Sequence, residues 1–397
     1  MRVSTAALHA QGVANILRNQ SALAKTQNEL ALATRLVSAK DDPGAWARAA
    51  GLDQQVAQFA RYQDNASVVE HRLGLEETAL TSATEVLDRV RELALQANSA
   101  NASRDARQSI AQEMQSQLEQ LLAISNSGDG EGRYLFAGTN DGSAPFSMAA
   151  VGANYSGNAS QRLMDIGPER SVALGDTGAQ VFQNLRGGNG TFAVSAAAGN
   201  TGTVKLDGAK VFDASAWDGG SYTVSFAAGN YQVHDAGNTL VASGAYQSGT
   251  AIRFRGAELT LSGAPVDGDS VSVTPSQTQD MFTVVQNMIA LVSAMPADAA
   301  GRAHEQTNFF GALQELDTAM ERVMSVRATV GHRLNAVDDA GSQIEALDVQ
   351  ANSTLSSLRD LDYAEATARL NLQMTALQAA QQSYSRIQGM SLFDFLR

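Results

Sequence analysis

The fold is decided by residues 52–97, which read LDQQVAQFARYQDNASVVEHRLGLEETALTSATEVLDRVRELALQA. An apolar residue falls at every seventh position, and a second apolar row follows three residues behind the first. The first row is Leu52, Phe59, Ala66, Leu73, Leu80, Leu87 and Ala94, and the second is Tyr62, Val69, Ala83, Val90 and Ala97. This repeat is typical of a helix that packs along another helix. It predicts one helix from about Gly44 to Asn98, roughly 80 Å long at 1.5 Å per residue.

A matching seam lies near the other end of the chain, where mostly apolar residues alternate in steps of three and four. It runs through Leu313, Leu316, Met320, Val323, Arg327, Val330, Leu334, Val337, Gly341, Ile344, Asp348, Ala351, Leu355 and Leu358. Shorter amphipathic helices are predicted over 103–126 and 281–292. Because a single long helix cannot hide its own apolar stripe, these helices must pack together as an elongated bundle.

The stretch Asp41-Asp42-Pro43 is predicted to be a helix start and hinge. Aspartate is a favoured N-cap residue, and proline is favoured at the first helical position because its missing N–H would have no partner there.

The middle of the chain has a different composition. Between Gly138 and Asp280 lie 22 of the 34 glycines, and glycine is costly inside helices but useful at turns. Short alternating segments separated by turn residues predict a small antiparallel barrel or sandwich. Its predicted core aromatics are Phe192, Phe212, Trp217, Tyr222, Phe226, Tyr231, Tyr246 and Phe254.

The two ends carry weaker seams that glutamine and threonine interrupt. Polar residues in a seam weaken it and restrict its choice of partner, so we expect these two helices to order against each other and against neighbouring subunits. Residues 1–40 also carry five basic residues and only one acid, Glu29, in an acidic protein. The predicted assembly interface comprises Val13, Ile16, Leu23, Leu30, Val37, Leu370, Met374, Leu377, Tyr384, Ile387, Leu392 and Phe393.

Composition excludes several classes of function. The 397 residues carry a net charge of -13 and no cysteine, which argues against a general nucleic-acid binder and excludes disulfides and thiolate sites. No apolar run is long enough to span a membrane, and the first residues lack the apolar stretch of a cleaved secretory signal. No catalytic, cofactor or metal motif is present, so we predict that the protein is not an enzyme.

Several motifs together resemble the flagellin superfamily, and within it the family of flagellar hook–filament junction proteins. They are Met1-Arg-Val-Ser-Thr5, Ala39-Lys-Asp-Asp-Pro43, Gly132-Arg-Tyr-Leu-Phe-Ala-Gly-Thr-Asn140 followed by Pro145-Phe146, Val330-Gly-His-Arg-Leu-Asn335, Ala376-Leu-Gln-Ala-Ala-Gln-Gln-Ser-Tyr-Ser385 and Ser391-Leu-Phe-Asp-Phe-Leu396. The sequence departs from flagellin itself, which has Asp-Asp-Ala-Ala-Gly where this chain has Asp-Asp-Pro.

The resemblance implies a structural adaptor that sits between the first hook-associated protein on the hook side and flagellin on the filament side. The terminal helices would pair in an inner tube, copies of the chain would form a ring, and the β insert would project outward. It further implies export through the flagellar type III apparatus, with an export chaperone at the C-terminal helix. Two alternatives stay open: a filament-forming flagellin variant, and a surface adhesin or hydrolase that uses the β insert.

The predicted fold class is therefore multidomain α+β. A long antiparallel helical bundle has coiled-coil-like helices at both ends and a small inserted antiparallel β domain. Three domains are expected: the terminal helices in 1–43 and 355–397, a helical rod with β-hairpins in 44–186 and 276–354, and the β domain in 187–275.

Overall fold

The computed structural model describes residues 5–99, 102–294 and 299–393. Its helices are α1 (Thr5–Leu32), α2 (Pro43–Ala97), α3 (Arg104–Ser125), α4 (Gly178–Val181), α5 (Met281–Ala294), α6 (Ala299–Arg359) and α7 (Tyr363–Phe393). Its strands are β1 (Phe146–Met148), β2 (Ala153–Tyr155), β3 (Leu163–Gly167), β4 (Arg170–Ala173), β5 (Leu185–Arg186), β6 (Phe192–Ala196), β7 (Lys205–Val211), β8 (Tyr222–Ala227), β9 (Asn230–Asp235), β10 (Leu240–Ala245), β11 (Ala251–Phe254), β12 (Ala257–Ser262), β13 (Ser270–Pro275) and β14 (Thr278–Gln279). This order confirms the predicted class, in which helical flanks enclose an antiparallel β insert.

The chain divides into two compact units. The first comprises Met1–Asp64 and Asp339–Arg397, and the second comprises Asn65–Asp338. The predicted division into three domains is finer than this one and stays a prediction. No helix among the described residues is both long and apolar enough to cross a membrane.

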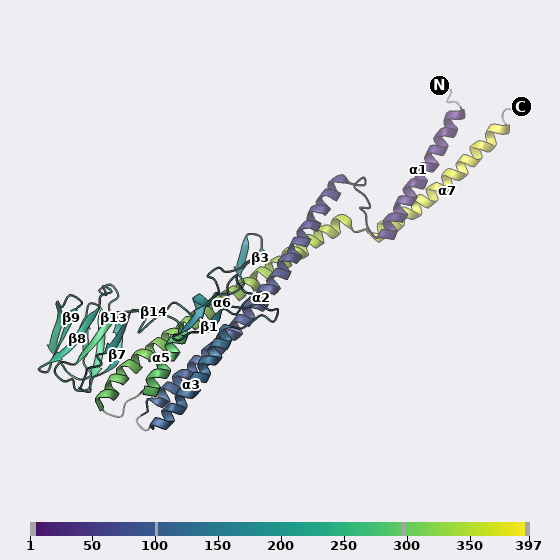
Figure 1. Ribbon diagram of the computed structural model, residues 1–397. Coiled ribbons are helices and arrows are strands. Elements are labelled where there is room, and N and C mark those ends of the chain that lie inside the picture. Colours follow the sequence, from purple (N-terminus) through teal and green to yellow (C-terminus); the bar gives the residue numbers. More distant parts are fainter. Residues whose placement is uncertain (1–4, 100–101, 295–298, 394–397) are drawn as a thin grey trace. The chain divides into compact units, whose positions relative to one another are not determined.

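In the second unit, α2 packs along α6 through the seams that the sequence predicts (Figure 1). Leu73, Leu80 and Leu87 of α2 are fully buried, as are Leu316 and Val323 of α6. Two ion pairs flank this seam. Arg327 contacts Glu77 at 2.6 Å and Arg91 contacts Asp317 at 2.9 Å. Since these pairs are partly exposed, the apolar seam supplies most of the stabilisation and the charges orient the helices.

The shorter helices cover the side of this pair. The Ala106 N–H donates to the Ser103 hydroxyl, which caps the start of α3. The predicted stripe of α3 is buried throughout, and α3 packs against α5. Both predicted helices are therefore confirmed.

Four phenylalanines join β1 and the segments around residues 136 and 182 to α5. Phe136 and Phe182 lie edge to face with ring centroids 5.1 Å apart, and Phe146 contacts both Phe182 and Phe282 at about 5.5 Å. The Phe136, Phe182 and Phe282 side chains are completely buried. This cluster explains why the 132–140 segment, which has little regular structure, is held in one place.

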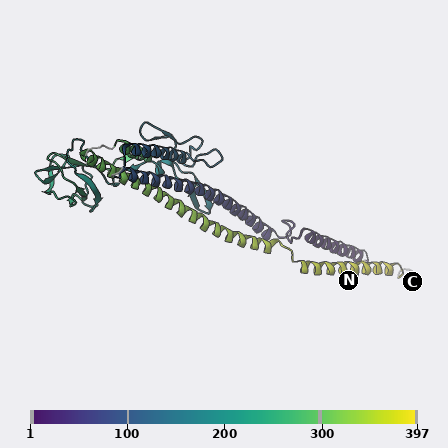
Figure 2. The same cartoon turned by 90° about the horizontal axis from the view of Figure 1, so that it is seen from below.

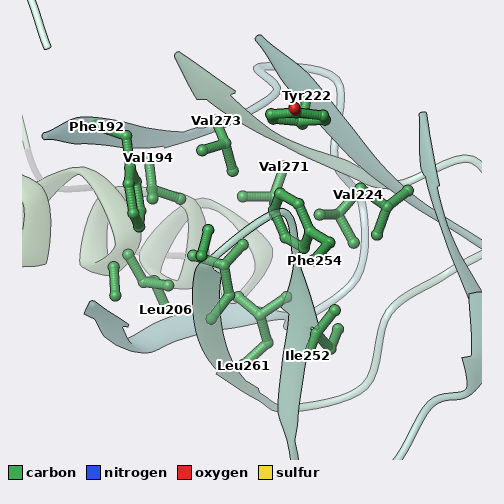
Figure 3. Packing of buried hydrophobic residues seen from close by; sticks show 14 of the residues in the cluster. Phe192, Val194, Leu206, Tyr222, Val224, Ile252, Phe254, Leu261, Val271 and Val273 are labelled. Carbon is green, nitrogen blue, oxygen red and sulfur yellow. The ribbon is translucent and has the colours of Figure 1, made fainter. Parts of the chain in front are cut away.

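The β insert consists of two antiparallel sheets that face each other across a shared core (Figure 3). One sheet has the strand order β10-β9-β8-β13-β6 and the other has β11-β12-β7. Alternate side chains point inward, as in the pair Val224 and Val271 of neighbouring strands. The core is formed by Phe192, Val194, Val204, Leu206, Ala209, Tyr222, Val224, Phe226, Val233, Ile252, Phe254, Ala257, Leu259, Leu261, Val271 and Val273.

The prediction for the core aromatics was wrong at one position. Phe212 is 48% exposed, and the Arg253 guanidinium lies over its ring at 5.4 Å. The ring therefore packs against a cation on the outside of the domain. Phe192, Tyr222, Phe226 and Phe254 are buried, while Trp217, Tyr231 and Tyr246 pack against the core from its edge.

The β insert is attached to the first turns of α6, beside which it lies in Figure 2. The Leu206 N–H donates to the hydroxyl of the fully buried Thr307, and the Gln314 amide donates to the Ala209 carbonyl, each at 3.1 Å. Phe310 adds an apolar contact to the core of the insert. These contacts involve β7 and the helix face directly, so the insert is not held by its linkers alone.

A buried carboxylate interrupts the apolar seam of α2. Glu76 is 1% exposed, and its Oε1 accepts a hydrogen bond from the Asp176 N–H at 2.9 Å. Both oxygens of Asp176 in turn accept hydrogen bonds from the Arg333 guanidinium at 2.9 Å. Burial, and then the charge of Asp176, raises the pKa of Glu76 to about 8, so Glu76 is neutral at neutral pH.

The raised pKa of Glu76 predicts a pH-dependent stability. Between about pH 4.5 and 8 the unfolded chain releases a proton that the folded chain keeps, so the free energy of unfolding falls as pH rises, by at most about 1.4 kcal/mol per pH unit. Glu76→Gln should therefore stabilise the protein more at pH 8 than at pH 5. The measurement is thermal unfolding at several pH values, with the exposed Glu70→Gln as the control. An equal effect of Glu76→Gln at both pH values would contradict it.

Candidate assembly interface

In the first unit, α1 and α7 pack as an antiparallel pair, so that the start of α1 and the end of α7 lie at the same end of the pair (Figure 1). At that end the Tyr384 ring lies against Gly12, where an added Cβ would come within 2.9 Å of a ring carbon. His9 meets the same ring edge to face, with centroids 5.8 Å apart. Gly12 therefore allows the two helices to approach closely at this point.

The predicted interface residues divide by exposure. Ile16, Leu23, Leu30, Val37, Leu370, Leu377 and Tyr384 are partly buried, and none of them is fully buried. Val13 and Met374 are each 42% exposed. The side chains of Ile387, Leu392 and Phe393 lie outside the described residues. The pairing of α1 with α7 therefore covers only part of the predicted apolar surface.

Further apolar side chains of the pair face solvent. Leu372 is 72% exposed, Leu17 is 58% exposed and Leu32 is 54% exposed. The sequence seams did not include these three residues. A soluble chain rarely exposes large apolar side chains this densely unless another surface covers them. The exposed set is thus suited to contact with other subunits.

The segments that join this pair to α2 and α6 are bonded to each other. Thr34 and Asp360 form an antiparallel bridge, and the Arg35 N–H donates to the Arg359 carbonyl at 2.7 Å. The Arg359 guanidinium makes two hydrogen bonds to the Asp53 carboxylate, at 2.9 and 2.6 Å. The two connections are therefore one joint rather than two separate linkers.

The Asp41-Asp42-Pro43 stretch lies within this joint. Helix α2 begins at Pro43, and the Asp42 carboxylate accepts hydrogen bonds from the N–H groups of Gly44 and Ala45 at 3.0 and 2.9 Å. The Asp41 carboxylate accepts the Ser38 N–H at 2.9 Å and contacts the Lys25 ammonium at 2.7 Å. Lys25, and then Ser38, lowers the pKa of Asp41 below its ordinary value. Asp42 caps the helix, while Asp41 ties the connection to α1.

Sequence patterns missed a set of charged residues between α1, α7 and the connection. Glu29 is only 3% exposed, and its carboxylate lies 3.6 Å from Arg369 and 3.9 Å from Lys25. The sequence did contain one signal, because Glu29 is the only acid among residues 1–40. The described residues contain no group of three or more side chains that could hold a metal ion.

Comparisons with protein families match both flanks. Residues 3–141 match the model of the bacterial flagellin N-terminal helical region, and residues 313–396 match that of the C-terminal helical region. Residues 195–275, within the β insert, match the D2-like domain of flagellar hook-associated protein 1.

Individual relatives match most or all of the chain. Flagellar hook-associated protein 3 of Salmonella typhimurium is 25% identical over 397 residues, which cover 100% of both chains. The crystal structure of FlgL from Xanthomonas campestris has 36% identity and a TM-score of 0.71, covering 77% of this chain and 99% of that one. The flagellar junction protein FlgL from Legionella pneumophila has 30% identity and a TM-score of 0.73, covering 79% of this chain and 100% of that one.

The cap at Asp42 predicts a local effect on α2. Asp42→Ala removes the acceptor for two N–H groups, which should weaken the first turn by about 1 kcal/mol and raise its opening about fivefold. Amide hydrogen exchange at Gly44 and Ala45 measures this change. Asp42→Asn, which keeps an acceptor, is the control and should leave the exchange nearly unchanged. Equal exchange in all three proteins would show that the cap does not hold this turn.

Proposed function

Since the chain belongs to the family of flagellar hook-associated protein 3, we propose that it is a structural adaptor of the bacterial flagellum that joins the hook to the flagellin filament. The observation that carries this proposal is the α1–α7 pair, which brings the two terminal helices together and leaves large apolar side chains exposed. A subunit that must contact several neighbours needs such a surface, because burial of apolar area drives association.

The partners follow from the same reasoning. The first hook-associated protein would bind on the hook side, flagellin would bind on the filament side, and copies of this chain would form a ring. The predicted seam residues would hold α1 to α7, while the exposed set with Leu17 and Leu372 would meet neighbouring subunits. The match of both flanks to flagellin helical regions supports a shared mode of packing with flagellin.

Export would precede assembly. The chain has no cysteine, so no disulfide has to be opened before an unfolded chain passes through the type III apparatus. Among the side chains that the structure describes, the terminal helices bury few in the single subunit, which suits a segment that orders on assembly. A chaperone at the C-terminal helix would cover the same apolar surface beforehand.

The alternative functions have less support. A filament-forming flagellin variant would share the flanks, but a relative that matches over the full length is a flagellar hook-associated protein 3, and a flagellar junction protein matches 79% of the chain. An adhesin on the β insert would need a binding surface there, and its aromatic side chains are mostly used in the core. The relatives are structural flagellar proteins, and we propose no catalytic activity for this chain.

The exposed apolar surface gives the test of this function. In cells that lack the native gene, Leu372→Asp should abolish filament attachment and swimming, because a charge at an apolar contact leaves a buried, unpaired carboxylate. The helical content and unfolding midpoint of the purified chain should stay unchanged, since Leu372 is exposed there. Flagellin released into the medium measures the assembly defect.

Asn371→Asp is the matched control, since it adds the same charge at the adjacent exposed position and should support normal swimming. Full motility of the Leu372→Asp strain would contradict the proposed contact surface. Full motility of cells without the gene would contradict the adaptor role itself.

A further inference from the structure

Five residues of alternating charge connect α7, α1 and the connection that follows α1. From Glu365 the chain of contacts runs through Arg369, Glu29 and Lys25 to Asp41. The successive distances are 3.6, 3.6, 3.9 and 2.7 Å. Three separate segments of the chain therefore meet at one row of charges.

The centre of this row is buried. The Glu29 side chain is 4% exposed, whereas Arg369 is 38% exposed and Glu365 is 74% exposed. Glu29 Oε2 has no hydrogen-bond partner among the described residues, so the nearby cations provide its compensation. A buried carboxylate that lost these cations would be strongly destabilising. The outer pair with Glu365 contributes little, because solvent screens it.

Apolar contacts alone do not define how α1 is aligned with α7. Leu23 and Leu30 repeat at seven residues, as do Leu370 and Leu377. A shift by one repeat therefore exchanges one leucine for another and leaves most apolar contacts possible. Regular seams of this kind tolerate slippage unless a polar residue opposes it.

The charged residues of the two helices disfavour such a shift. Helix α1 contains no acid other than Glu29, and α7 contains only one base besides Arg369, namely Arg386, which lies about 25 Å further along the helix. A shift by one turn would bring Glu365 or Gln373 toward Glu29. A shift by one heptad would bring Asp362 or Ala376 toward Glu29. None of these residues carries a positive charge.

We propose that Glu29 and Arg369 are specificity-determining residues that set the register of α1 on α7. Lys25 contacts both Glu29 and Asp41, so it also holds the segment between α1 and α2 in place relative to this charged contact. The register decides which apolar side chains of the two helices are presented together, and it places Tyr384 against Gly12. The proposal concerns the chain itself and does not depend on the identity of its flagellar partners.

Cysteine pairs can measure the register, because the chain has no cysteine of its own. Gly12→Cys with Tyr384→Cys reports the observed register, since these positions touch. Gly12→Cys with Ala380→Cys and Tyr384→Ala reports a slip of one helical turn. Cross-linking of the purified full-length chain by a short bifunctional maleimide then gives the population of each alignment.

When Glu29 and Arg369 are left unchanged, the first cysteine pair should cross-link well and the second poorly; these yields are called the parent yields. Glu29→Gln or Arg369→Gln should lower the yield of the first pair by at least about tenfold relative to the second. Arg369→Lys, which keeps the charge, should retain the parent yield. Exchange of two charges, Glu365→Arg with Arg369→Glu, moves the cation by one turn and should favour the second pair at unchanged composition.

Arg386→Gln is the matched control, because it removes the other base of α7 and should leave both yields at the parent level. Circular dichroism checks that each variant keeps its helical content. A parent-like yield of the first pair in Glu29→Gln and in the exchanged variant would overturn the proposal. Equal losses in Arg386→Gln and Arg369→Gln would also overturn it, since total charge rather than position would then decide.

Discussion

A long helix cannot bury its own apolar stripe, and the rest of this structure depends on that constraint. Leu73 and Leu80 of α2 are fully buried, as are Leu316 and Val323 of α6, the helix that packs along α2. Since α2 and α6 lie on either side of the central segments, their pairing makes the chain fold back on itself. The β insert is then an insertion in the sequence between two helices, and α1 and α7 are available to pair with each other.

Two buried glutamates of the long helices interrupt the apolar contacts there, and they have different consequences. Burial, and then the nearby charge of Asp176, raises the pKa of Glu76, so this residue stays neutral at neutral pH. Glu29 lies beside two cations, Lys25 and Arg369, with which it forms ion pairs. The first glutamate makes the free energy of unfolding depend on pH. The second favours one register of α1 on α7 over the shifted ones.

Much of the fold could be predicted because the relevant signals are local. The heptads of α2, the stripe of α3 and the turns of the β insert each reflect a period within one segment. The prediction for Phe212 was wrong because the residue lies in the bend that directly follows β7, and the sequence does not show which way a side chain points there. The joint formed by Thr34 and Asp360 was not predicted at all, since backbone pairing between distant segments has no sequence signature.

The sequence by itself determined which segments are helices, which are strands and which residues form the apolar seams, because periodicity follows from backbone geometry. It also carried the motifs by which the family is recognised. Only the tertiary structure decided which charges are buried and with what partners. Glu29 and Arg369 lie near opposite ends of the chain, and the energy of their contact depends on distance and burial, which exist only after the helices have packed.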